Sequence, residues 1–162
     1  MRSTQSRFRG AAVGAAAAVV LGLLAGAEAR ANPLTPLSWG WEWPKTDFTK
    51  KSVDLGEILS GGPPKDGIPS IDRPRFVPVA EEKDLAPSEP VVGLVIKGKA
   101  RAYPLRILTW HEIVNDQLAG VPVTITYCPL CNSAVAFDRR VDGRVLDFGT
   151  TGKLRKSDMV MY

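Results

Sequence analysis

The chain contains few of the side chains that bind metals or transfer protons, since its 162 residues include two cysteines and one histidine. A closed zinc site of four cysteines is therefore excluded, because it needs a second pair of thiolates. No Ser-His-Asp arrangement, glycine-rich phosphate loop or paired-carboxylate motif stands out. The most distinctive chemistry is left to Cys128, Cys131 and His111.

Long uninterrupted hydrophobic runs are also missing. Residues 1–31 carry three early arginines, then an alanine-rich stretch at 11–27 that glycines interrupt, then small residues up to Ala31. This order is typical of a secretory signal peptide and not of a membrane span of about 20 apolar residues. We expect cleavage after Ala31, export to the periplasm or the extracellular space, and no stable transmembrane span afterwards.

The exported part lacks a basic tract. Without residues 1–31 the chain has 17 basic and 16 acidic residues, a net charge of +1, and the two signs are interspersed. Nucleic-acid binding needs a basic patch or stripe, so the sequence predicts no nucleic-acid partner.

Residues 32–66 are expected to form an extended lead-in, which ends in the breaker-rich sequence SGGPPKDG. Its tryptophans Trp39, Trp41 and Trp43 are spaced by two residues, as on one face of a strand. They would pack on the domain or stack on carbohydrate, and we favour packing because large aromatic side chains bury well.

Residues 67–162 have the periodicity of a single β-rich α+β domain. Strands are predicted on both sides of Lys97-Gly98, over 121–128, on both sides of Asp142-Gly143, and at the end of the chain, joined as short antiparallel hairpins. One main helix is predicted over about 105–118, from the apolar spacing of Ile107, Trp110, Val114 and Leu118. The final alternating DMVMY has no polar residue after it, so we expect a domain truncated at its C-terminus.

Cys128 and Cys131 form a Cys-Pro-Leu-Cys turn that has three interpretations. As a structural disulfide its four-residue ring would contribute only about 2 kcal/mol by loop-closure entropy. A thioredoxin-like redox centre needs a helix after the first cysteine, and the sequence that follows is hairpin-like instead. Reversible redox of the pair on another fold stays open, as does a metal site.

Two thiolates and the imidazole of His111 would suit a thiophilic metal, copper ahead of zinc. Met159 and Met161 would face one side of a strand and add thioether sulfur. His111 would equally be a hydrogen-bonded core residue, and the methionines would equally be core residues. Glu112, Asn115 and Asp116 would orient His111 or form the solvated face of the helix.

The segments AYPLRILTWHEIVND and GVPVTITYCPLCNSAVAFDRRVDGRVLDFG, with the residues that follow, resemble the domain-of-unknown-function 3179 family of exported bacterial and archaeal proteins. The resemblance runs from about Gly67 to Tyr162. It implies an exported protein with a histidine segment, here 111–116, and a Cys-Pro-Leu-Cys turn, and it supports truncation. Family members commonly have glycine at the position of Asn132, and asparagine also tolerates a left-handed backbone.

We therefore predict that Cys128, Cys131 and His111 converge on one site. The site would bind a thiophilic metal or cycle between dithiol and disulfide, with His111 as third ligand or as acceptor of the thiol proton. The alternative is a non-enzymatic structural or interaction module with an oxidised cysteine pair and a core histidine.

Overall fold

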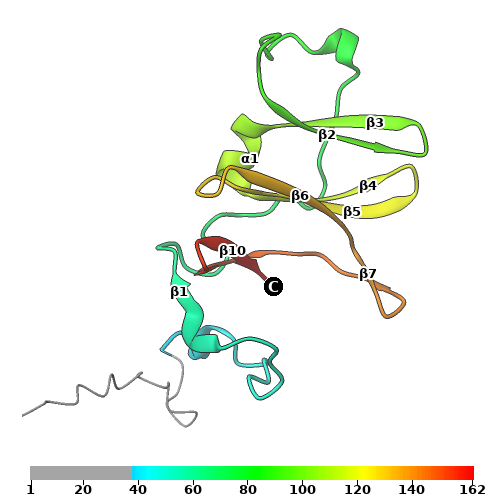
Figure 1. Ribbon diagram of the computed structural model, residues 1–162. Coiled ribbons are helices and arrows are strands. Elements are labelled where there is room, and N and C mark those ends of the chain that lie inside the picture. The colour runs from blue at the N-terminus through cyan, green and yellow to red at the C-terminus, as the bar shows by residue number, and fades with distance from the viewer. Residues whose placement is uncertain (1–37) are drawn as a thin grey trace, which may run out of the picture. The chain divides into compact units, whose positions relative to one another are not determined.

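The computed structural model describes residues 38–162, and Figure 1 shows their arrangement. The predicted signal peptide at 1–31 lies outside these residues. Within the described residues the regular elements are three short 3₁₀ helices, one α-helix and ten strands: η1 (Gly40–Glu42), η2 (Leu55–Glu57), β1 (Ile58–Ser60), η3 (Val79–Glu81), β2 (Val91–Ile96), β3 (Lys99–Pro104), α1 (Leu105–His111), β4 (Ile113–Leu118), β5 (Val121–Cys128), β6 (Ser133–Asp138), β7 (Arg140–Val141), β8 (Arg144–Val145), β9 (Thr150–Arg155) and β10 (Asp158–Met161). No helix among residues 38–162 is long and apolar enough to cross a membrane.

The central sheet has the antiparallel order β4-β5-β6. Its middle strand β5 is buried from Pro122 to Cys128, because neighbouring strands pair with both of its edges. The hydrophobic core gathers on this sheet and on α1 and β3, and its buried members are Tyr103, Leu108, Val114, Leu118, Val123, Ile125 and Tyr127. The fold is therefore β-rich with a single α-helix, which agrees with the predicted class.

The helix is half as long as predicted. It ends at His111, and Glu112 takes a left-handed φ of +57° that stops it. Residues 113–118 form β4 instead, because Ile113 and its successors pair with β5 in register with Thr126. The predicted apolar stripe is also wrong, since α1 buries Leu108 and leaves Trp110 76% exposed.

The two predicted hairpin turns are confirmed. Residues in positive φ occupy both central positions of three tight turns, each with glycine second, as such hairpins require: Lys97-Gly98, Ala119-Gly120 and Asp142-Gly143. The hairpin around Asp142-Gly143 is shorter than the sequence indicates. It contains only β7 and β8, because β6 pairs with β5.

A second sheet has the order β1-β9-β10. Its central strand carries Lys153, a buried lysine whose ammonium group lies 2.9 Å from the Glu42 carboxylate. This ion pair holds the segment around η1 against β9. The pairing of β10 with β9 shifts register after Val160, which pairs with Lys153, to Met161, which pairs with Thr150, so the unpaired residues lie on β9. Thioether ligation by Met159 and Met161 stays a prediction.

The tryptophan segment is not a strand. Backbone bonds from Glu42 to Trp39 and from Trp43 to Gly40 close a turn of 3₁₀ helix, which removes the alternation of the three rings. Trp39 packs edge-on against Phe48 with ring centroids 5.6 Å apart, while Trp41 is 79% exposed. The expected packing of the tryptophans is therefore present for Trp39 and not for Trp41.

Candidate functional site

The cysteines lie at the end of β5 and in the turn that leads to β6. Cys128 is the last residue of β5 and is buried, whereas Cys131 is exposed. Both thiols are free, and their sulfur atoms lie 3.0 Å apart. The turn is closed by a backbone bond from Cys131 to Cys128, and Asn132 has the left-handed φ of +47° that its residue type tolerates.

The residues after the turn form a strand and not a helix. Ser133 pairs with Cys128 at the start of β6. No helix dipole is therefore directed at either sulfur, and the feature that stabilises the thiolate in thioredoxin-like centres is missing from this turn. The hairpin-like strand that the sequence predicts after the cysteines is confirmed.

A second turn, between β9 and β10, meets the cysteine turn. Its residues Lys156 and Ser157 both have positive φ, at +52° and +68°, although neither is glycine. The Cys131 thiol lies 3.0 Å from the Ser157 carbonyl oxygen and 3.7 Å from Oδ1 of Asp158. Two hairpins that belong to different sheets thus touch through sulfur and oxygen atoms.

Asp158 completes a three-residue cluster. Among the described residues, one group of potential metal ligands has its atoms within 4.8 Å of one another, and it consists of Cys128, Cys131 and Asp158. Asp158 is not among the site residues predicted from the sequence, and it lies 27 residues from Cys131. The only local signal was a carboxylate at the start of a predicted strand, and that signal is common.

The electrostatics of the cluster favour a neutral Cys131 thiol in the absence of a cation. The hydrogen bond with Cys128 is the main cause that raises the pKa of the Cys131 thiol to about 11, and lost hydration and the negative charge of Asp158 add to it. The sulfur and oxygen atoms of the cluster produce a negative electrostatic potential. A bound cation would offset this potential and stabilise the thiolates.

His111 lies at the end of α1 and outside that cluster. Its Nδ1 is 2.8 Å from the carbonyl oxygen of Pro69. A carbonyl only accepts, so Nδ1 carries the proton and Nε2 of the neutral ring keeps its lone pair. A hydrogen bond from one ring nitrogen to a backbone carbonyl is the kind of contact that orients metal-binding histidines.

The pairing of β4 with β5 places His111 and Cys128 at the same end of the sheet. The Tyr127 N–H donates to the Glu112 carbonyl oxygen at 2.8 Å, one residue beyond the pair of Ile113 with Thr126. His111 precedes Glu112 and Cys128 follows Tyr127, so these two residues come next where the two chain segments run side by side. Side-chain contact between them stays a prediction.

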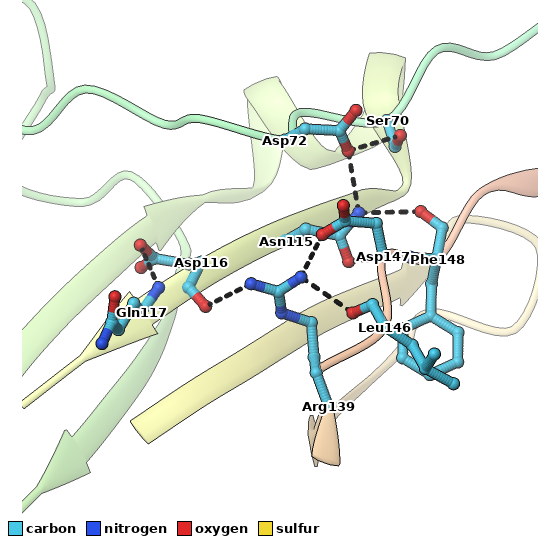
Figure 2. A network of polar contacts seen from close by, with 9 residues as sticks. All are labelled: Ser70, Asp72, Asn115, Asp116, Gln117, Arg139, Leu146, Asp147 and Phe148. Carbon is cyan, nitrogen blue, oxygen red and sulfur yellow. Dashed lines mark hydrogen bonds and ion pairs between the residues drawn. The ribbon is translucent and has the colours of Figure 1, made fainter. Parts of the chain in front are cut away.

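Asn115 and Asp116 hold the fold together instead of forming a solvated helix face. Both are buried on β4, and Figure 2 shows their network. The Asn115 amide donates to Asp72 and to the Phe148 carbonyl, each at 2.8 Å. The Arg139 guanidinium donates to the Asp147 carboxylate and, at 3.2 Å, to the Asp116 carbonyl. Their polar groups are thus used by neighbouring segments.

Glu112 differs from these two residues. Its carboxyl group is half-buried, and burial raises its pKa above the usual range. Its left-handed backbone ends α1 and turns the chain into β4. The geometry assigns it a structural role at the junction of the two elements.

The fold and the site define a β-rich domain with a dithiol–carboxylate cluster between two hairpin tips. The sequence matches the family model described as Protein of unknown function (DUF3179) over residues 65–162. The chain belongs to this family, which confirms the resemblance in its histidine and cysteine segments. No curated protein and no solved structure matches the chain closely.

Proposed function

We propose that Cys128, Cys131 and Asp158 form a binding site for a thiophilic metal ion in an exported protein. The observation that carries this proposal is the convergence of their three ligand atoms within 4.8 Å from two separate hairpins. The Ser157 carbonyl oxygen, 3.0 Å from the Cys131 sulfur, supplies a further hard donor at the same place.

The donor set bears on the choice of metal. Cysteine and histidine alone led to copper ahead of zinc, since Cu(I) prefers soft ligands. A carboxylate within the cluster reverses that order, because zinc accepts sulfur, nitrogen and carboxylate oxygen in one tetrahedral site. Zinc is therefore our first candidate and copper our second.

Binding requires a small movement of the sulfur atoms. Zinc–sulfur bonds of about 2.3 Å at a tetrahedral angle separate two sulfurs by about 3.8 Å. The sulfurs of Cys128 and Cys131 are 3.0 Å apart, so a change of side-chain torsion within the turn suffices. His111, oriented through Pro69, is proposed as the fourth ligand or as the acceptor of the thiol proton.

Native mass spectrometry tests the site directly. The full chain is exported to the periplasm, purified without chelator and reduced with a phosphine. We expect a bound zinc or copper mass that is lost in Cys128→Ser and weakened in Asp158→Asn. The matched control is Asp142→Asn, which also removes a carboxylate but leaves an Asn-Gly pair suited to its hairpin turn.

Other outcomes of the mass-spectrometry experiment distinguish the competing functions. Full metal retention in Cys128→Ser would contradict the site. In a parallel sample that is not treated with phosphine, a metal-free chain two hydrogens lighter than the reduced mass would favour an oxidised pair, and thus either a redox couple or the structural module.

Thiol–disulfide exchange is the second candidate function. One observation favours it, namely that Cys131 is exposed while Cys128 is buried, so an incoming thiol would reach one sulfur first. The reduction potential of the pair, measured against glutathione, would separate a redox couple from an inert disulfide.

A further inference from the structure

We propose that oxidation of Cys128 and Cys131 to a disulfide expels the bound metal ion, so that a hydroperoxide controls whether the site is filled. This inference rests on the proposed metal site and adds its regulation. It follows from the positions of the three ligands. Both sulfur atoms lie in one short turn, and the Asp158 carboxylate lies in another.

The sulfur positions lie between the two states. A tetrahedral zinc ion needs the sulfurs about 3.8 Å apart, and a disulfide needs them about 2.05 Å apart. Their separation is 3.0 Å, so either state requires a displacement of about 1 Å or less. One turn therefore serves both states, and the two states exclude each other because they use the same sulfurs.

The chain offers no competing thiol. Cys128 and Cys131 are its only cysteines, so an intramolecular disulfide joins these two. Once they are joined, the cluster retains the Asp158 carboxylate and the Ser157 carbonyl, together with His111 if it ligates. Zinc sites depend on strong nitrogen and thiolate ligands, so the loss of both thiolates releases the ion.

The chemistry balances with a hydroperoxide as two-electron oxidant. The exposed Cys131 sulfur attacks the terminal oxygen, the O–O bond breaks, and an alcohol leaves with one proton. The Cys128 sulfur then displaces the hydroxyl group of the Cys131 sulfenic acid, and water leaves with the second proton. Two metal-bound thiolates are oxidised and one peroxide bond is reduced. The two protons taken up by the alcohol and the water come from the solvent, and the metal ion departs with its charge.

Release would also loosen a contact between the two sheets. A bound ion ties the cysteine turn after β5 to the Lys156–Asp158 turn, whose strands belong to the other sheet. The disulfide lies wholly within one turn and makes no such tie. The metal-filled and oxidised states therefore differ in the protection of the Lys156–Asp158 backbone.

The test uses the full exported chain, reduced and loaded with one equivalent of zinc. Cumene hydroperoxide is added in steps, while a chromogenic chelator reports free zinc and intact-mass spectrometry reports the loss of two hydrogens. We expect one zinc released per two thiols consumed, with zinc rebinding after reduction. Hydrogen exchange at Lys156–Asp158 should quicken as zinc leaves.

Three variants make the outcome specific. Cys131→Ser cannot form the disulfide. Zinc that this variant binds should therefore not be released at one ion per two thiols consumed. Asp158→Asn keeps both thiols and should oxidise faster than the loaded wild type, because its zinc is weaker. Asp142→Asn should behave as the wild type.

Two results would overturn the inference while leaving the metal site intact. The first is zinc that stays bound after both thiols are consumed. The second is a loaded pair that resists a hydroperoxide excess which fully oxidises the metal-free pair. Failure of the reduced chain to bind zinc or copper at all would instead overturn the proposed function itself.

Discussion

The side-chain amide of Asn115 pairs with both backbone groups of Phe148, as a neighbouring strand would. Its Nδ2 donates to the Phe148 carbonyl at 2.8 Å, and its Oδ1 accepts from the Phe148 N–H at 3.1 Å. The same Nδ2 donates to Asp72 at 2.8 Å. One buried residue of β4 thus fixes two segments that are distant in sequence, including the one that leads into β9 (Figure 2).

Replacing this amide should be costly. In Asn115→Ala the backbone groups of Phe148 lose this partner, and Asp72 keeps only its hydrogen bond from Ser70. We expect the free energy of unfolding to fall by about 3 kcal/mol, since each unpaired buried polar group costs about 1–3 kcal/mol. Urea denaturation measures it, and Gln117→Ala on the exposed face of the same strand should stay within about 0.5 kcal/mol.

Asn115→Asp gives a sharper version of the same test. It keeps an acceptor for the Phe148 N–H but places a carboxylate against Asp72 and the Phe148 carbonyl. Its loss of stability should be greatest near pH 7 and smaller at pH 4, where a carboxyl group takes up a proton. A pH-independent loss would contradict the assigned contacts.

Tyr103 should make the protein sensitive to alkali. Its burial, and then its hydrogen bond to Asp116, raise its pKa above the ordinary value of 10.0. A raised pKa in the folded state stabilises the protein below the pKa of the unfolded state. That contribution is lost as the pH rises above about 10.

Two measurements check this expectation. Absorbance at 295 nm should show a tyrosine that ionises above its ordinary range and that is missing in Tyr103→Phe. Tyr103→Phe should lose about 1 kcal/mol near neutrality, for one hydrogen bond to Asp116, and should lose less additional stability above pH 10 than the wild type. Identical alkaline profiles for the two proteins would contradict the assignment.

The turn that touches the cysteines should gain from glycine. Ser157 has φ +68°, a conformation that costs an L-residue about 1–2 kcal/mol. We expect Ser157→Gly to stabilise the metal-free protein by about 0.5–1 kcal/mol after the entropy cost of glycine. Thermal denaturation with chelator present measures the change.

Gly143 provides the control of opposite sign. It occupies the equivalent place in the Asp142-Gly143 turn with φ +73°, and no atom lies within 4 Å of a Cβ added there. Gly143→Ala should therefore lose about 1 kcal/mol through backbone strain alone. Equal signs for the two substitutions would show that backbone conformation does not decide the stability of these turns.

The Cys131 thiol should alkylate slowly at neutral pH. Thiolate is the reacting form, so in the reduced, metal-free protein the rate should rise tenfold per pH unit without a plateau below the pKa of about 11. Cys128→Ser should lower that pKa most, since the hydrogen bond with Cys128 is the largest cause, and Asp158→Asn should lower it less. Iodoacetamide labelling with peptide mass mapping checks this, and a plateau near pH 9 would contradict it.

Local signals in the sequence were sufficient for the turns. Lys97-Gly98 and Asp142-Gly143 predicted hairpins correctly because glycine readily takes the positive φ that the second position of such a turn requires. The helix was predicted too long for the opposite reason. Ile107, Trp110, Val114 and Leu118 have helical spacing, but pairing with β5 recruits residues 113–118 into a strand.

The sequence by itself determined the family, the β-rich class, and the pair of thiols that dominates the chemistry. Only the tertiary structure decided which residue joins them. Asp158 reaches Cys131 because the tips of two hairpins from separate sheets meet, and no local pattern encodes a contact across 27 residues. Turn conformation depends on the few residues of the turn, whereas a ligand cluster depends on how distant strands pair and pack.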